Sequence, residues 1–296
     1  MDRVIDISPC TERMKMGSMS RILVLTGCLL GSSLPIFPAL AQTASTDPPK
    51  PASEAARTTW VLTLGAGAEY GPSYQGATDQ SFSFVPYFDY HRLGDPSVLD
   101  EPDDNFDVTL ISLKGLELGP VVGWRDGRST SDDSALAGLN EFDWNIDAGI
   151  FAQYWIAPNR FRLRFEGRWG LGNNEGFLAD FYADYFQPVG PKLTLSAGPR
   201  MSFADSSYMR TNFGITPQES AANGSLPAFD IGGGVKSVGF LVAATYQLTD
   251  NWDVQIYDRY DRLVGDAADS PIVTDIGSPN QNRIGFILRR SFDIKF

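Results

Sequence analysis

The stretch that decides the fold is Phe161-Arg162-Leu163-Arg164-Phe165-Glu166-Gly167-Arg168-Trp169-Gly170-Leu171. Its odd positions are apolar or small, and its even positions carry four charges and a glycine. Successive side chains of a β-strand point to opposite faces of the sheet. The stretch is therefore predicted to be a strand with one apolar face and one charged face.

The same alternation recurs along most of the chain. It is found in 60–70, 81–90, 106–114, 116–126, 142–154, 177–187, 192–203, 236–248, 252–260 and 282–296. Strands of about ten residues, with an apolar face that ends in aromatic side chains, suit a tilted crossing of a bilayer. A soluble sandwich also alternates, but usually with shorter strands, and it explains neither the aromatic ends nor the charged opposite face. We expect an all-β, transmembrane, antiparallel up-and-down β-barrel over residues 59–296.

The number of strands is ten to twelve, with twelve favoured. The periodicity marks eleven segments, whereas single-chain bacterial barrels normally have an even number of strands. The missing strand is expected within 81–105, where Pro86, Pro96 and Pro102 obscure the pattern. The connection 71–80 is also long at a point where a short turn is due.

The connections support the barrel because short turns alternate with long polar loops. Tight turns are expected at 157–159, 190–191 and 249–251, and long loops at 127–140, 204–232 and 262–281. In the second long loop, Thr216 and Glu219 have the spacing of a capping box, Pro217 suits the first helical position, and Gly224 suits the end. One short helix is predicted there.

The N-terminus has the features of an export signal. Basic residues precede an apolar stretch over 22–34 that is too short to span a bilayer, and Ala39-Leu40-Ala41 is a small-x-small cleavage site. We expect a cleaved signal peptide over 1–41 and a flexible periplasmic leader over 42–58, rich in Ala, Pro, Ser and Thr. The alternative is lipidation of Cys28, because Leu25-Thr26-Gly27-Cys28 resembles a lipoprotein box. Export of a barrel places the protein in the outer membrane of a Gram-negative bacterium.

Composition excludes several functional classes. The net charge of −12 and the lack of a basic stripe argue against nucleic-acid binding. Two cysteines and one histidine leave little for zinc or for His-based catalysis. His91 ends a strand and Ser83 is too far along that strand to touch it. We expect a non-enzymatic protein with no catalytic residue, metal or cofactor.

Charges on the polar strand faces are the candidate functional residues. Arg162, Arg164, Glu166 and Arg168 are predicted to point into the lumen, as are Asp143 and Asp147 from the preceding strand, with Asp147 near Arg168. Such charges either fill the lumen and make it rigid or line a narrow solute path. The acidic run Asp100, Glu101, Asp103 and Asp104 is interpreted as a solvated loop, with a weak Ca²⁺ site near lipopolysaccharide as the alternative. Arg290 interrupts the apolar face of the last strand, so either Arg290 lies near the rim of the barrel or its strand is shifted.

Several segments together resemble the MipA/OmpV family (MltA-interacting protein) of outer-membrane β-barrel proteins. They are 65–76, Leu118-Gly119-Pro120, 203–209 with 213–216, and 260–273, whose loop contains Asp266, Asp269, Ser270 and Pro271. The chain departs from the family pattern only in its closing strand. The resemblance implies a barrel in contact with outer-membrane lipid and lipopolysaccharide, acting as a scaffold that joins a murein-degrading lytic transglycosylase to a penicillin-binding protein. The alternative from the residues is a small pore or solute-binding barrel with a charged lumen.

Overall fold

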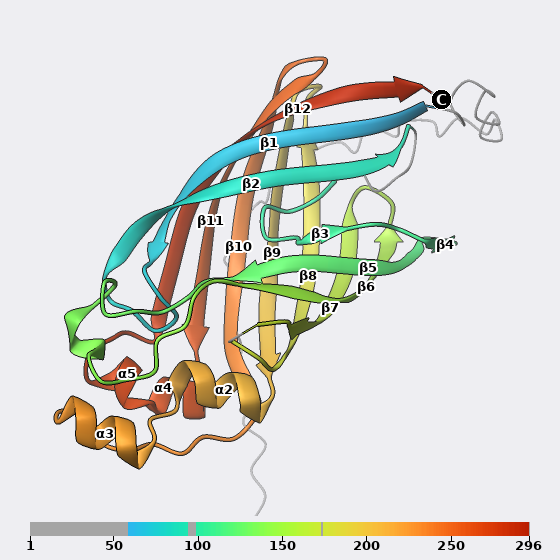
Figure 1. Ribbon diagram of the computed structural model, residues 1–296. Helices are drawn as coiled ribbons and strands as arrows, with labels where there is room; N and C mark the ends of the chain where they lie inside the picture. The colour runs from blue at the N-terminus through green and yellow to red at the C-terminus, as the bar shows by residue number, and fades with distance from the viewer. Residues whose placement is uncertain (1–58, 94–98, 173, 296) are drawn as a thin grey trace, which may run out of the picture. The chain divides into compact units, whose positions relative to one another are not determined.

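The computed structural model describes residues 59–93, 99–172 and 174–295. The predicted signal peptide and leader lie outside these residues. Twelve strands run in chain order (Figure 1), as β1 Thr59–Pro72, β2 Gln80–Arg92, β3 Phe106–Asp107, β4 Ile111–Leu113, β5 Leu116–Arg125, β6 Asn145–Ala157, β7 Phe161–Gly170, β8 Phe177–Val189, β9 Leu193–Ala204, β10 Gly234–Thr249, β11 Trp252–Leu263 and β12 Asn280–Lys295. The predicted all-β fold and the favoured count of twelve strands are confirmed.

Short helices occupy the long connections. They are the 3₁₀ turn η2 (Ser134–Leu136), α2 (Ser206–Phe213), α3 (Pro217–Asn223), α4 (Asp266–Asp269) and α5 (Pro271–Thr274). The predicted helix is α3, in which Thr216 and Glu219 form the capping box and Gly224 ends the helix with a positive φ of 74°. The other helices were not predicted. No helix of the described residues is both long and apolar enough to cross a membrane.

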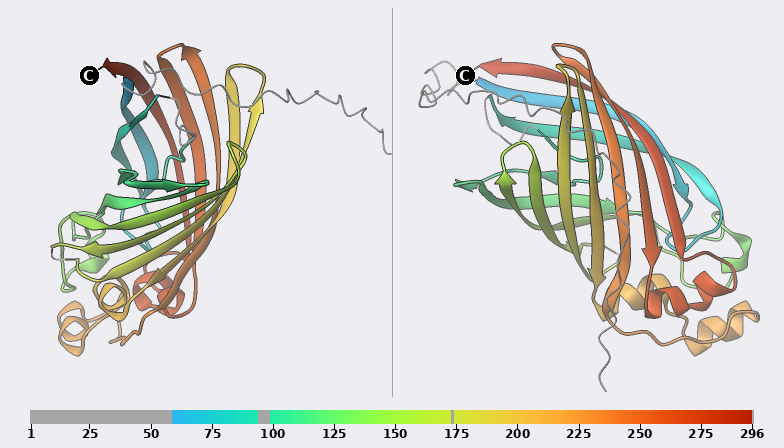
Figure 2. Two further views of the ribbon diagram at one scale, coloured as in Figure 1. Left: turned by 90° about the vertical axis from the view of Figure 1, so that its right-hand side faces the viewer. Right: turned by 180° about the vertical axis from the view of Figure 1, so that it is seen from behind.

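The strands form one antiparallel sheet in the order β2-β1-β12-β11-β10-β9-β8-β7-β6-β5-β3, with β4 also paired to β5. The first and last strands meet, with Thr59 opposite Lys295. We call the end of the barrel at this pair the terminal end. The opposite end, where α2 to α5 gather (Figures 1 and 2), is the helical end.

The sheet does not close by an antiparallel ladder. Neighbouring strands in this order run in opposite directions. The order contains eleven strands, because β4 lies beside β5 outside it, so the strands at its two ends, β2 and β3, run in the same direction. Both run from the helical end toward the terminal end, and no ladder joins them in the part of the chain that the structure describes. The contact between them is made by side chains, with the rings of Phe88 and Phe106 edge-on at 4.7 Å. We call this junction the seam.

The structure corrects the predicted position of the missing strand. The described residues of 81–105 contain β2 and no second strand. The twelfth strand arises because the predicted strand 106–114 is two short pieces, β3 and β4, that lie along the same partner, β5. The connection over 73–79, where a short turn was expected, is a loop at the helical end like the other long connections. The departure from regular strand-by-strand pairing therefore lies after β2 and not before it.

Burial alternates along the strands as the sequence predicts. In β7, Arg162, Arg164, Glu166 and Arg168 are buried while Leu163 and Trp169 are exposed. Large apolar side chains are exposed around the sheet, among them Phe82, Ile150, Ile256 and Phe286. An outward apolar surface and a charged interior are the arrangement of a barrel in lipid.

Arg290 lies on this outward face near its terminal end. It is exposed, sits opposite Trp252, the first residue of β11, and stacks on the rings of Trp252 and Phe292 at 5.3 and 4.7 Å. A cation near the membrane surface costs far less than one at the midplane. Of the two alternatives, the strand keeps a regular register, and Arg290 lies toward the terminal end of the outward face.

The helical end carries a packed cap. One apolar cluster joins Tyr208, Met209 and Phe213 of α2 to the ends of β8 and β11 and to α4 and α5. A second joins Tyr74, Leu136 and Ile272 from three different loops. Buried Arg128 ties the cap together by donating to the main-chain oxygens of Asn212 (2.7 Å) and Asn140 (3.2 Å). Burial lowers the pKa of Arg128 to about 10, which leaves it charged at neutral pH.

Candidate functional site

The lumen is occupied by a stretch of the chain itself. β2 ends at the terminal end, and Phe106 pairs with Val122 toward the helical end. The described residues just before Phe106 lie in the interior. Leu99–Asn105, which we call the inner segment, contacts inward side chains of β7, β9, β11 and β12. It lies inside the lumen and is not part of the sheet.

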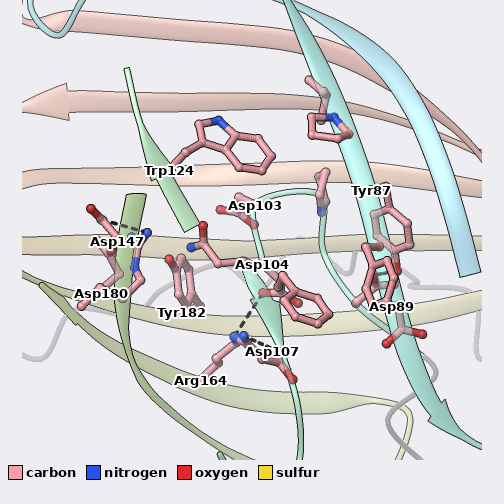
Figure 3. Close-up of a pocket in the computed structure, with 18 of the residues that line it drawn as sticks. Tyr87, Asp89, Asp103, Asp104, Asp107, Trp124, Asp147, Arg164, Asp180 and Tyr182 are labelled. Carbon is pink, nitrogen blue, oxygen red and sulfur yellow. Dashed lines mark hydrogen bonds and ion pairs between the residues drawn. The ribbon is translucent and has the colours of Figure 1, made fainter. Parts of the chain in front are cut away.

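Asp104 anchors the inner segment to β7. Its carboxylate receives two hydrogen bonds from Arg162, with Nη1 at 2.6 Å and Nη2 at 3.0 Å, and lies 3.5 Å from Nε of Arg164. Arg164 also donates to Asp107 at 2.6 Å, just after the segment (Figure 3). Bidentate arginine–carboxylate pairs fix geometry as well as charge.

Asp103 anchors the segment to a neighbouring part of the wall, on β9 and β11. It accepts from Nε and Nη2 of Arg200 on β9, at 2.7 and 3.1 Å, and from Arg259 on β11 at 3.0 Å. Asp184 of β8 bridges the two anchors because it accepts from both Arg162 and Arg200 at 2.7 Å. The two aspartates therefore belong to one continuous ionic network.

The start of the inner segment is held by β2, β9 and β12. Asp100 accepts from Arg289 at 3.0 Å and from the Tyr87 hydroxyl. Glu101 accepts from the Ser196 hydroxyl at 3.0 Å. The acidic run interpreted as a solvated loop is thus folded inside the barrel, and that interpretation is wrong. Each of its four carboxylates meets a partner on the wall because a buried charge needs compensation.

A second charged group links the lumen to the cap. Arg168 contacts Asp180 at 2.5 Å and Asp147 at 3.5 Å, so the predicted neighbours Asp147 and Arg168 do meet. Asp147 also lies 2.6 Å from Nε of Arg125, whose guanidinium donates to the main-chain oxygens of Asn174 and Gly176. These last contacts lie at the helical end.

Most of the inward arginines also stack on rings. Arg164 lies 4.7 Å from the centre of the Phe151 ring, Arg200 5.0 Å from Tyr182 and Arg289 4.9 Å from Tyr87. A guanidinium that is both ion-paired and stacked has few accessible rotamers. The interior is therefore rigid as well as charged.

The predicted luminal residues have two fates. Asp147, Arg162, Arg164, Glu166 and Arg168 are buried on the inward face. Asp143 is exposed and precedes β6, which begins at Asn145, so its predicted inward position is wrong. The partners that the sequence reasoning missed are Arg125, Asp180, Asp184, Arg200, Arg259 and Arg289. Alternation alone could have found Arg200, which lies on the polar face of 192–203.

The family-motif loop is part of the cap. Asp266 and Asp269 are exposed, while Ser270 and Pro271 are buried. The Ser270 hydroxyl donates to the main-chain oxygen of Phe213 at 2.6 Å and accepts from the Ile272 amide at 3.3 Å. The loop therefore joins α2 to α5, and its carboxylates form no pair with Ser270.

A cavity of about 1060 Å³ lies beside the inner segment. Its lining includes inward residues of β2, the inner segment and the arginines of β7, and it reaches outward aromatic residues at the seam (Figure 3). His91 is among the lining residues, with Nδ1 2.6 Å from Oδ2 of Asp89. The site can bind a molecule among fixed charges and aromatic rings.

A twelve-stranded antiparallel sheet with an apolar outer face and a charged interior defines a β-barrel of the outer-membrane type. A comparison with family models matches residues 64–292 to the family described as MltA-interacting protein MipA. The chain belongs to the MipA family.

Comparison with curated proteins finds no match. Solved structures with a similar arrangement include three outer-membrane proteins of low identity. They are Neisserial surface protein A (12% identity, 79% of this chain and 97% of that chain, TM-score 0.25), an outer-membrane channel from Pseudomonas putida F1 (11%, 83% and 100%, 0.37) and Pseudomonas aeruginosa OprD (9%, 80% and 96%, 0.27).

Proposed function

We propose that the protein is a non-enzymatic scaffold of the outer membrane of a Gram-negative bacterium, exported with a cleaved signal peptide, for murein-remodelling enzymes. Its partners would be a lytic transglycosylase of the MltA type, as the family description indicates, and a penicillin-binding protein. Outer-membrane lipid and lipopolysaccharide would surround the barrel. No catalytic residue is assigned.

The observation that carries this proposal is the occupied lumen. The inner segment is bound to β7, β9, β11 and β12 by buried ion pairs, and the cap packs over the helical end. A barrel whose lumen is occupied by a firmly bound segment suits a platform that presents its ends to partners better than an open path for solutes.

The terminal end is the surface we assign to periplasmic partners. In bacterial barrels the short turns face the periplasm. Here the short connections 158–160, 190–192 and 250–251 lie at the terminal end and expose Arg160 and Lys192. A soluble periplasmic enzyme would meet these turns first.

Affinity capture from detergent extracts of the envelope tests the scaffold role. The tagged full chain should recover a lytic transglycosylase, and Arg160→Glu with Lys192→Glu should reduce its recovery. The matched control is Arg210→Glu, an exposed position on α2 at the helical end. Recovery that is absent for the unaltered chain, or reduced equally by the control, would count against the proposal.

A second candidate is a small pore or solute-binding barrel. The cavity of about 1060 Å³ beside the inner segment favours it, because small-molecule sites typically occupy about 300–1,000 Å³. Conductance across planar bilayers would distinguish a pore from a scaffold with a filled lumen.

A further inference from the structure

The seam is a junction in the wall at which the described residues form no ladder, antiparallel or parallel. β2 and β3 run in the same direction, so the antiparallel pairing used elsewhere in the sheet cannot join them. Strand edges that carry free N–H and C=O groups are not tolerated in contact with hydrocarbon. No ladder joins β2 to β3 among the described residues, so a polar molecule that enters at the seam could pair with groups of these edges.

The cavity is lined by residues from both sides of the seam. On β2 its lining includes inward Val85 and Tyr87, which pack on the inner wall, and outward Phe84 and Phe88. On the other edge it includes inward Asp107, which is paired to Arg164. Outward Phe106, Leu110 and Trp124 also line it on this side. The lining thus includes side chains from both faces of both edges, as expected for a cavity that opens at the seam.

The lining changes in character along this path. The outward part is aromatic and aliphatic, with Phe84 70% and Leu110 72% exposed. The inward part contains charges that already pair with one another, as Arg164 does with Asp107. Counting the whole lining, eight basic and ten acidic side chains give a formal charge of −2 with His91 neutral. A ligand would have an apolar part at the seam and a polar part inside, and a negatively charged head would be disfavoured.

We propose that the seam is a lateral binding site for an uncharged amphiphile that enters from the surrounding bilayer. Its apolar chain or ring lies against Phe84, Leu110 and the outer side of the touching rings of Phe88 and Phe106. Its polar head, which carries both hydrogen-bond donors and acceptors, reaches the facing edges of β2 and β3 and the cavity. This inference specifies a ligand for the second candidate function and is independent of the scaffold role, so capture of a murein enzyme and ligand binding can succeed or fail separately.

Photolabelling tests the site on the full processed chain. The protein is reconstituted in phosphatidylcholine vesicles with a long-chain alcohol that carries a diazirine in mid-chain, and labelled peptides are identified by mass spectrometry. We expect label on inward Val85 and Tyr87 in addition to outward residues. Label confined to outward residues would overturn the proposal.

Filling the cavity should remove the inward label. Ser83 faces inward on β2 and lines the cavity, so Ser83→Trp should lower labelling of Tyr87 roughly fivefold or more. Ser81 lies on the same face but does not line the cavity, and Ser81→Trp should leave the label unchanged. Equal labelling in both variants would contradict the assignment.

Closing the seam gives a second test. It is needed if Ser83→Trp does not show the heat-modifiable migration on gels that marks a folded barrel. Phe88→Cys with Phe106→Cys, cross-linked by oxidation or with a short bis-maleimide, should reduce the inward label relative to the reduced form. The control is Phe165→Cys with Phe181→Cys, whose rings lie 5.1 Å apart across the regular β7–β8 ladder. Inward label that survives closure of the seam would refute lateral entry.

The charge of the head group is tested with the matching carboxylate probe. It should label the inward residues roughly fivefold less than the alcohol. Equal or stronger inward labelling by the carboxylate would overturn the assignment of an uncharged ligand.

Discussion

Arg162 of β7 and Asp104 of the inner segment form a two-point ion pair inside the barrel, with Nη1 at 2.6 Å and Nη2 at 3.0 Å from the two carboxylate oxygens. Both side chains are buried. The pair joins a segment that has no place in the sheet to the strand whose alternation is the clearest in the sequence. The ion pair holds the inner segment inside the barrel. In this way a sheet with eleven strands in its order is stabilised from within and not by a further strand.

Replacing Asp104 should release this anchor. Asp104→Asn leaves Arg162 and Arg164 short of a charged partner in a buried site, which typically costs about 3–5 kcal/mol. We expect a lower urea midpoint of the folded, fast-migrating form in detergent. Asp143→Asn, at an exposed position, is the control and should have little effect. Equal midpoints for the two variants would show that the anchor does not stabilise the barrel.

Close packing of β6 on β7 gives a second prediction. A Cβ added at Gly149 would lie 1.9 Å from the main-chain oxygen of Gly167, so the strands would have to move apart. Gly149→Ala should destabilise the barrel by about 1–3 kcal/mol. Gly234→Ala, where a Cβ meets nothing within 4 Å, should be neutral. The refolded fraction of each variant on unboiled gels measures the difference, and comparable refolding would argue against this strand spacing.

Ser270 should matter for the cap and not for the barrel wall. Ser270→Ala removes the hydrogen bond to the Phe213 oxygen and the cap of α5, a loss of about 1–2 kcal/mol. Amide hydrogen exchange of Met209–Phe213 should accelerate while exchange in the strands stays the same. Asp266→Asn, at an exposed position of the same loop, should leave both unchanged. Unaltered exchange in α2 of the Ser270 variant would remove this role.

Glu219 should make the attachment of α3 sensitive to acid. Burial raises the pKa of Glu219, but hydrogen bonds from the main chain and side chain of Thr216 and from the Asn140 amide outweigh it, so the pKa is lowered. A carboxyl group with a lowered pKa contributes stability that is present above its unfolded value, about 4.3, and is lost as pH falls through the folded value.

The amide resonance of Asn140 in micelles reports this titration. It should shift with an apparent pKa below about 4.3 in the unaltered chain, and Glu219→Gln should abolish the shift. Glu175→Gln, at an exposed position of another loop, should leave the titration in place. A titration that persists in the Glu219 variant would assign it to another group.

The strand faces were predictable because they obey a local rule. Alternation of period two in 161–171 fixes which side chains face lipid, and the observed burial of Arg162 and Arg164 follows from it. The helix α3 was predictable for a similar reason, since Thr216 and Glu219 satisfy each other within one turn.

The inner segment was not predictable in this way. The carboxylates of Asp103 and Asp104 look like those of a solvated loop until the distant partners Arg200, Arg259 and Arg162 are brought around the barrel. The odd count of eleven segments was the signal that something other than a strand crosses the interior. Asp143 was misplaced because alternation does not mark where a strand begins, and β6 begins two residues later.

The central claim is that the inner segment closes the lumen, and single-channel recording in planar bilayers tests it most directly. The unaltered chain should show no discrete conductance steps, whereas Asp103→Asn with Asp104→Asn should show them, because the anchors to Arg200 and Arg162 are weakened. Steady steps from the unaltered chain that these substitutions leave unchanged would contradict the account.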